Sequence, residues 1–251
     1  MSETELKTKV ALTAKMLVKA GLIEGFGHVS LRTKEGFFIT STRPFKNISS
    51  KNVISYKFSK STKKTLKDLP LETPMHAAIY KTRSDINAIC RGHGKFVSNW
   101  AVSSDELPLL HGLGAIPGER VKNNNDINLI TTVNSAKEVA ESLGNDISII
   151  LGSNGCLSTG KNLLEAATRL YFLEERARIA IFSRSSGIKI RNISKEAWEE
   201  RIKHTEAETV SLERNIQQFT QLRNYVISLL TLDSVSELDS LNRRYPQRRS
   251  T

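Results

Sequence analysis

The sequence predicts a mixed α/β fold, a single domain of three layers in which helices flank one central, mostly antiparallel sheet. Segments with helical and with strand periodicity alternate along the chain, as a layered α/β domain requires. Near the start, two short strand-like segments are separated by a turn at residues 33–36, and such a hairpin pairs its strands antiparallel. The length of 251 residues suits one domain of this class with an appendage.

Each predicted element has its own signal in the sequence. Apolar residues from Leu6 to Leu17 recur at helical spacing, and Gly21 ends this first helix. A second helix begins at Thr73, with Pro74 at its first position, where a missing N–H costs nothing. The remaining predicted strands cover residues 28–31, 36–40, 55–68 (with an exposed loop), 86–90 and 147–151, and the remaining helices cover 96–102, 134–143, 162–187 and 194–226.

Three regions are predicted along the chain. Residues 1–190 form the α/β domain, residues 191–230 form a C-terminal helical extension, and residues 231–251 form a basic, mobile tail. The helix predicted over residues 194–226 has many charges and few aliphatic anchors. We therefore expect it to pack against a neighbouring subunit or to project outward.

The composition excludes some classes of function. The net charge of +11 comes from 37 Lys and Arg against 26 Asp and Glu, but it is spread along the chain without a nucleic-acid-binding motif. We expect a solvated basic surface or attraction of a small anion, rather than binding of nucleic acid. The two cysteines form no disulfide framework, which predicts a cytoplasmic setting. No apolar run is long enough to span a bilayer and no secretory signal is evident.

Four polar segments fall at predicted strand ends or helix starts, where side chains converge on pockets. They are residues 27–30, 71–76, 89–94 and 152–155. Glu72 precedes a helix, so its carboxylate caps that helix or serves as a base, and capping is the better interpretation from this position alone. His93 ends an apolar strand between two glycines, where a ligand can approach closely. His76 reads as a core residue and Asn154 as a turn residue.

Taken in order, these segments resemble the class II aldolase/adducin family over roughly residues 6–180. The landmarks are residues 27–30, 38–40, 72–80, 85–90, the Asn154–Gly155 turn with Gly160, and residues 164–166 leading into 173–174. The resemblance implies a divalent metal, usually zinc, held by a His-x-His pair and a third His before a Gly. It also implies a Glu that moves protons beside the metal.

The resemblance places these functions on numbered positions of this chain. Glu72 falls on the catalytic Glu, and Arg91-Gly92-His93 falls on the His-x-His pair, so His93 is the one metal ligand kept there. The third His falls on Asn154. The family's phosphate-binding positions hold His28, Thr42-Arg43 and Pro70-Leu71, and a His at the first of them is similar to the branches that handle non-phosphorylated carboxylic acids.

Two functions follow as hypotheses. The first is a carbon–carbon lyase, an aldolase or decarboxylase, acting on a small anionic carbonyl or carboxylate compound. Glu72 is then the acid/base, His93 binds zinc, and the substrate is held by His28, Arg43, Arg91 and Asn154. The alternative is a catalytically inactive binding or assembly protein. In both cases the resemblance implies a homo-oligomer, with a tetramer expected.

Overall fold

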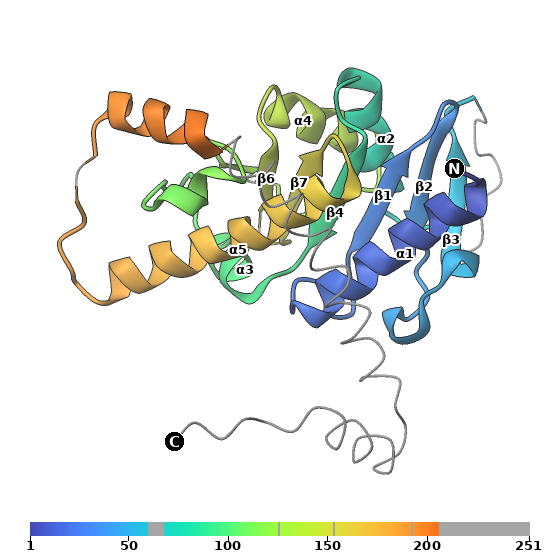
Figure 1. The fold of residues 1–251 in the computed structure, drawn as a ribbon, viewed down its shortest axis with the longest axis horizontal. Coiled ribbons are helices and arrows are strands. Elements are labelled where there is room, and N and C mark those ends of the chain that lie inside the picture. The colour runs from blue at the N-terminus through green and yellow to red at the C-terminus, as the bar shows by residue number, and fades with distance from the viewer. Residues whose placement is uncertain (60–67, 125, 153, 192, 206–251) are drawn as a thin grey trace, which may run out of the picture. The chain divides into compact units, whose positions relative to one another are not determined.

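The computed structural model describes residues 1–59, 68–124, 126–152, 154–191 and 193–205. A seven-stranded sheet runs through them in the order β3-β2-β1-β4-β7-β6-β5 (Figure 1). Its strands are β1 (His28–Arg32), β2 (Gly36–Thr40), β3 (Val53–Lys57), β4 (Ala88–Gly92), β5 (Lys122–Asn124), β6 (Ser148–Leu151) and β7 (Cys156–Gly160). All neighbours pair antiparallel except β5 and β6, which are parallel.

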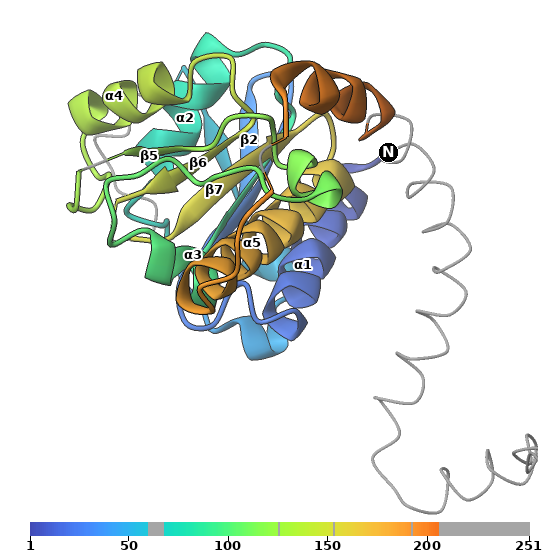
Figure 2. The ribbon, with the colours of Figure 1, turned by 90° about the vertical axis from the view of Figure 1, so that its left-hand side faces the viewer.

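Helices cover both faces of the sheet. They are α1 (Glu3–Lys19), α2 (Thr73–Thr82), α3 (Lys95–Trp100), α4 (Val133–Leu143) and α5 (Leu163–Ser185), with 3₁₀ turns at Phe45–Asn47, Ser50–Asn52 and Gly112–Ala115. Helices α1, α3 and α5 lie on one face and α2 and α4 on the other, as Figures 1 and 2 show. Each face has its own apolar cluster, which confirms the predicted three-layer, mostly antiparallel class.

The first helix illustrates how local sequence sets an element. Ser2 accepts a hydrogen bond from the Glu5 N–H while the Glu5 side chain accepts from the Ser2 N–H, a capping box. Val10, Ala14 and Leu17 then place a continuous apolar stripe against the sheet. Gly21, at φ 71°, follows the helix end in a conformation that glycine adopts without strain.

Two strands of the sheet were missing from the sequence-based expectations. β7 was missed because residues 156–160 contain little but small and polar side chains, and β5 because residues 122–124 are polar. β7 is nevertheless buried along its whole length, since it pairs with β4 on one side and β6 on the other. Residues 156–160 therefore form a strand because the two neighbouring strands pair with them. This pairing also places the turn at Asn154 beside the end of β4.

The C-terminal predictions are covered only in part. Residues 195–205 are helical, within the helix expected over residues 194–226, while the remainder of that helix and the tail at 231–251 lie outside the described residues. Across the part of the chain described, no helix combines the length and apolarity that a bilayer crossing needs.

Candidate functional site

Strand pairing brings the predicted site residues to one end of the sheet. His28 at the start of β1 is paired in register with Arg91 near the end of β4. Gly92 is paired with Cys156 at the start of β7, so the turn before β7, with Asn154, lies beside the end of β4. Glu72 stands at the N-terminus of α2, on the face of the sheet that α2 covers. Segments far apart in sequence thus meet at this end of the sheet.

The centre of this cluster is an ion pair between Glu72 and Arg91. Arg91 Nε lies 2.8 Å from Glu72 Oε2, and the two side chains are only 1% and 6% exposed. Glu72 Oε1 also accepts from the backbone N–H of Ile130 at 3.4 Å and from Asn154 Nδ2 at 3.4 Å. The Glu72 side chain makes no capping hydrogen bond to α2, so the capping interpretation is wrong and the carboxylate belongs to the cluster.

Arg91 spreads its guanidinium across the other members of the cluster. Nη2 donates to the Asn154 carbonyl at 2.7 Å, and Nη1 contacts the His93 ring, with its distance to Nδ1 being 2.8 Å. Nη1 also reaches Nε2 of the same ring. A guanidinium can only donate hydrogen bonds, so His93 must offer it an unprotonated nitrogen. Arg91 is therefore the residue that joins Glu72, His93 and Asn154.

His93 is held in one tautomer by a backbone contact. Its Nδ1 lies 3.2 Å from the carbonyl oxygen of Phe26, which can only accept, so Nδ1 carries the proton. Arg91 Nη1 contacts both ring nitrogens and so lies against the ring. Burial, followed by the positive charge of Arg91, lowers the pKa of His93 to about 4, so the imidazole is neutral at physiological pH.

His28 closes the cluster on the β1 side. Its Nε2 lies 4.0 Å from Glu72 Oε2, and its ring meets the ring of His76 edge to face at 5.5 Å. Burial and the neighbouring His76 and Arg91 hold the pKa of His28 well below its ordinary value. Within the described residues, Nδ1 of His28 has no hydrogen-bond partner. His28 is thus a neutral imidazole with one nitrogen still available to a ligand or a water molecule.

His76 is the core residue that the sequence indicates, although it is a polar one. Its Nδ1 lies 2.8 Å from Ser30 Oγ, which also lies 2.8 Å from the hydroxyl of Tyr80. Burial lowers the pKa of His76 to about 3, so the ring is neutral. Ser30 and Tyr80 extend the polar region beneath the cluster, and only the alternation of Ser30 with apolar neighbours in β1 could have indicated this from the sequence.

Arg43 is the predicted residue that makes no recorded contact with the cluster. Its Nη2 lies 2.9 Å from Asp68 Oδ2, and its side chain is 54% exposed. The Thr42 N–H also donates to the Asp68 carbonyl at 2.8 Å, so two contacts hold residues 42–43 to Asp68. The core cluster therefore consists of Glu72, His28, Arg91, His93 and Asn154, with Arg43 outside it.

The turn that presents Asn154 depends on glycine. Gly155 has φ 81°, and a Cβ there would collide with the carbonyl oxygen of Gly92 and meet the His93 ring at 2.9 Å. The backbone of this turn can therefore approach the end of β4 only without a side chain. That close approach is what allows Arg91 to reach the Asn154 carbonyl.

The donors around Arg91 do not fit a divalent metal. A catalytic zinc site uses about three protein ligands, at about 2.0–2.1 Å for histidine nitrogens. No group of three or more His, Cys, Asp or Glu side chains suited to a metal occurs among the described residues. The two strongest donors, His93 Nε2 and Glu72 Oε2, both face the Arg91 guanidinium. The zinc predicted at His93 thus lacks a ligand set in the described part of the chain.

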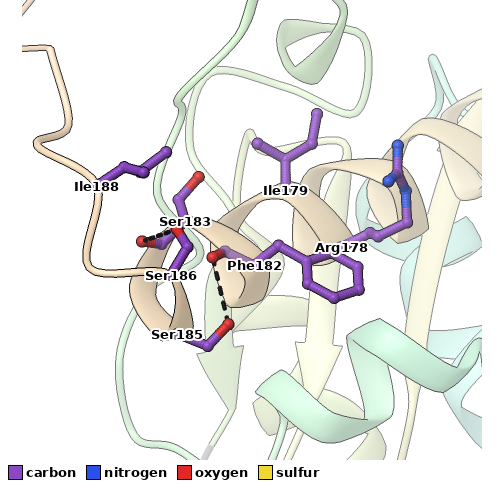
Figure 3. A pocket seen from close by; sticks show the side chains of 7 residues that line it. All are labelled: Arg178, Ile179, Phe182, Ser183, Ser185, Ser186 and Ile188. Atoms are coloured by element: carbon purple, nitrogen blue, oxygen red, sulfur yellow. Dashed lines mark hydrogen bonds between the residues drawn. The ribbon is translucent and has the colours of Figure 1, made fainter.

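A separate pocket lies at the C-terminal end of α5. It has a volume of about 300 Å³ and is shown in Figure 3. It is lined by Arg178, Ile179, Phe182, Ser183, Ser185, Ser186 and Ile188. None of the predicted site residues lines it, so the cluster around Arg91 remains the candidate site.

Comparison with known proteins identifies the group to which this architecture corresponds. The family model for the class II aldolase and adducin N-terminal domain matches residues 8–181. The chain is similar to an L-fuculose phosphate aldolase of Haemophilus influenzae, with 26% identity over 198 residues, covering 78% of this chain and 91% of the relative.

Solved structures show the same fold. An L-fuculose 1-phosphate aldolase superposes with a TM-score of 0.74 at 24% identity, covering 82% of this chain and 98% of that chain. An aldolase II superfamily protein from Pseudomonas syringae superposes with a TM-score of 0.73 at 19% identity, covering 88% and 94% respectively. At these identities the superpositions establish the fold alone.

Proposed function

The chain belongs to the class II aldolase and adducin family, and from that premise we propose that it is a carbon–carbon lyase, an aldolase or a decarboxylase. Its substrate is a small anionic carbonyl or carboxylate compound without a phosphate group. The observation that supports this proposal is the buried Glu72–Arg91 pair at 2.8 Å, with His28, His93 and Asn154 around it. A carboxylate, a fixed cation and two neutral imidazoles are the groups that such a reaction needs.

The chemistry divides between these residues. When the bond between two carbons breaks, its electron pair passes to the neighbouring carbonyl and leaves an enolate oxygen. The Arg91 guanidinium supplies positive charge for that oxygen in a site that excludes water. Glu72 takes the proton released before the bond breaks and returns a proton to the enolate carbon. The family typically uses a divalent metal for the charge that Arg91 provides here.

The remaining residues hold the substrate. His28 offers its free Nδ1, and the Asn154 amide lies beside Glu72. Arg43, which is exposed and paired with Asp68, would receive a carboxylate from outside the cluster. His93 positions the Arg91 guanidinium through the contact of its ring with Nη1.

The experiment that tests this function is the substitution Glu72→Gln. We expect turnover of 2-hydroxy and 3-oxo acids to fall about a hundredfold or more, because the amide cannot exchange the proton. The matched control is Glu35→Gln, since Glu35 is exposed and pairs with Lys57 on the surface. Turnover that survives Glu72→Gln unchanged, in protein with an unchanged circular dichroism spectrum, would contradict the proposal.

The same ion pair favours a second candidate function. Both oxygens of Glu72 have partners within the protein, Arg91 on one side and Asn154 and the Ile130 N–H on the other, so the carboxylate is well satisfied. A protein that only binds a ligand or assembles with a partner does not need Glu72 to be free to exchange a proton. Binding of a carboxylic acid that raises Tm, with no turnover of any compound in the panel, would favour this candidate.

We also propose a cytoplasmic homo-oligomer, a tetramer, that binds no nucleic acid. The free and buried cysteines Cys90 and Cys156 support the cytoplasmic setting. Light scattering on a gel-filtration column measures the mass of the assembly. A monomer there, or DNA affinity that falls steeply with salt, would contradict this part of the proposal.

A further inference from the structure

The Arg91 guanidinium touches every other position at which the family resemblance places a metal ligand or the catalytic Glu. The resemblance puts those ligands at positions 91, 93 and 154 and the Glu at 72. Arg91 Nε is 2.8 Å from Glu72, Nη2 is 2.7 Å from the Asn154 carbonyl, and Nη1 contacts His93. One side chain thus lies among all of these positions, although its contact at position 154 is with the backbone carbonyl.

His93 is oriented by a backbone contact as a metal ligand would be, but the Arg91 guanidinium lies against its ring. A metal-binding histidine commonly donates its second N–H to a carbonyl, which fixes the ring and turns the other nitrogen toward the metal. His93 has this arrangement, with Nδ1 at 3.2 Å from the Phe26 carbonyl. Both of its ring nitrogens contact Arg91 Nη1.

A divalent ion cannot share this position with Arg91. An ion about 2 Å from His93 Nε2 would lie in contact with Arg91 Nη1, which belongs to a group that stays protonated in proteins. Moving Arg91 aside would leave Glu72, which is 5% exposed, without its countercharge. The backbone of Gly92 and Asn154 also accepts from the guanidinium, so several contacts would be lost together.

We propose that the Arg91 guanidinium permanently replaces the divalent metal in this chain. The site then carries one fixed positive charge and receives an anionic oxygen, a carboxylate or an enolate, without a metal ion. The choice of ligand rests on the proposed function, whereas the replacement of the metal rests on the contacts of Arg91 alone. Restoring histidines at positions 91 and 154 is accordingly expected to create a zinc site with His93.

The test is a measurement of zinc content on the full chain. Wild type, Arg91→His/Asn154→His, and the same double variant with His93→Gln are incubated with excess zinc chloride, desalted and analysed by plasma mass spectrometry. We expect no stoichiometric zinc in wild type, one zinc per chain in the double variant, and its loss with His93→Gln. His204→Gln is the control for surface binding, because exposed His204 pairs with Glu200 one helical turn away.

Two outcomes would overturn the proposal. One is wild type that retains one zinc per chain and loses it on His93→Gln but not on His204→Gln. The other is a folded double variant that takes up no zinc, since positions 91, 93 and 154 would then not surround an ion. If the double variant does not fold, the wild-type comparison with His93→Gln decides by itself. These readouts do not depend on turnover, so they stand whether or not Glu72→Gln abolishes activity.

Discussion

At the scale of single residues, the buried pair of Glu72 and Arg91 dominates the energetics of the site. Removing one partner leaves an uncompensated charge in the interior, which typically costs about 3–5 kcal/mol. We expect Arg91→Met to lower the free energy of unfolding by this amount, and Glu72→Leu to do so as well. The double variant leaves no unpaired charge, so it should cost at least about 1 kcal/mol less than the sum of the two single costs. Interaction energies of about 0.5–3 kcal/mol are typical for contacting residues.

Urea denaturation of the four proteins measures this coupling. The control cycle is Glu35→Gln with Lys57→Met, an exposed pair on the surface, for which we expect a coupling below about 1 kcal/mol. Additive effects at positions 72 and 91 would show that the ion pair contributes nothing specific to stability. The Arg91 cation would then not be held at the site by its pairing with Glu72.

At the scale of elements, Arg176 of α5 anchors the segment that leads into β5. Its guanidinium donates to five backbone carbonyls, and the side chain is 2% exposed. Burial lowers the pKa of Arg176 to about 10, which still leaves it charged. The carbonyls belong to Leu107, Pro108, Gly114, Gly118 and Glu119.

We expect Arg176→Lys to destabilise the chain by about 3 kcal/mol or more. A lysine has three donors on one atom and cannot reach acceptors spread around a planar guanidinium, and each buried acceptor left unpaired costs about 1–3 kcal/mol. Arg178→Lys, at a partly exposed position paired with Glu175 in the same helix, should change stability by less than about 0.5 kcal/mol. Equal effects in urea denaturation would contradict this role of Arg176.

The helices and the first hairpin were predictable because their signals are local. The apolar spacing of α1, the Pro74 start of α2 and the stripe of α5 each lie within one element. β5 and β7 were not predictable, since their sequences are polar or small and only their neighbours make them strands. Arg176 sits on the same stripe as Leu173 and Ala180, a spacing that marks it as buried, but its five acceptors come from a distant segment.

The site was predictable in part for a related reason. An arginine inside the apolar strand at residues 88–92 requires a carboxylate partner, which points to Glu72. The contacts of backbone groups at Phe26 and Ile130 could not be derived, because a backbone donor or acceptor leaves no mark in the sequence. Arg43 was placed in the site from the resemblance alone, and the structure records its partner as Asp68.

At the scale of the whole molecule, buried neutral imidazoles make stability depend on pH. His76 is fully buried, and its pKa is about 3 in the folded state, chiefly through burial, against about 6.5 when unfolded. Between these values the unfolded chain binds more protons than the folded chain. This contribution to stability is therefore complete above about pH 6.5 and is lost as pH falls toward 3, at up to roughly 1.4 kcal/mol per pH unit.

His93 and His28, whose pKa values are also lowered, act in the same direction, so stability should fall steeply between pH 7 and 5. We expect the decrease in the free energy of unfolding between pH 7 and pH 5 to be about 2 kcal/mol smaller in His76→Gln than in wild type. Urea denaturation at pH 7 and at pH 5 measures this difference. Tyr80→Phe is the control, because it disrupts the same hydrogen bonds through Ser30 without removing an imidazole. An equal pH dependence in wild type and His76→Gln would mean that His76 titrates alike in the folded and unfolded chain.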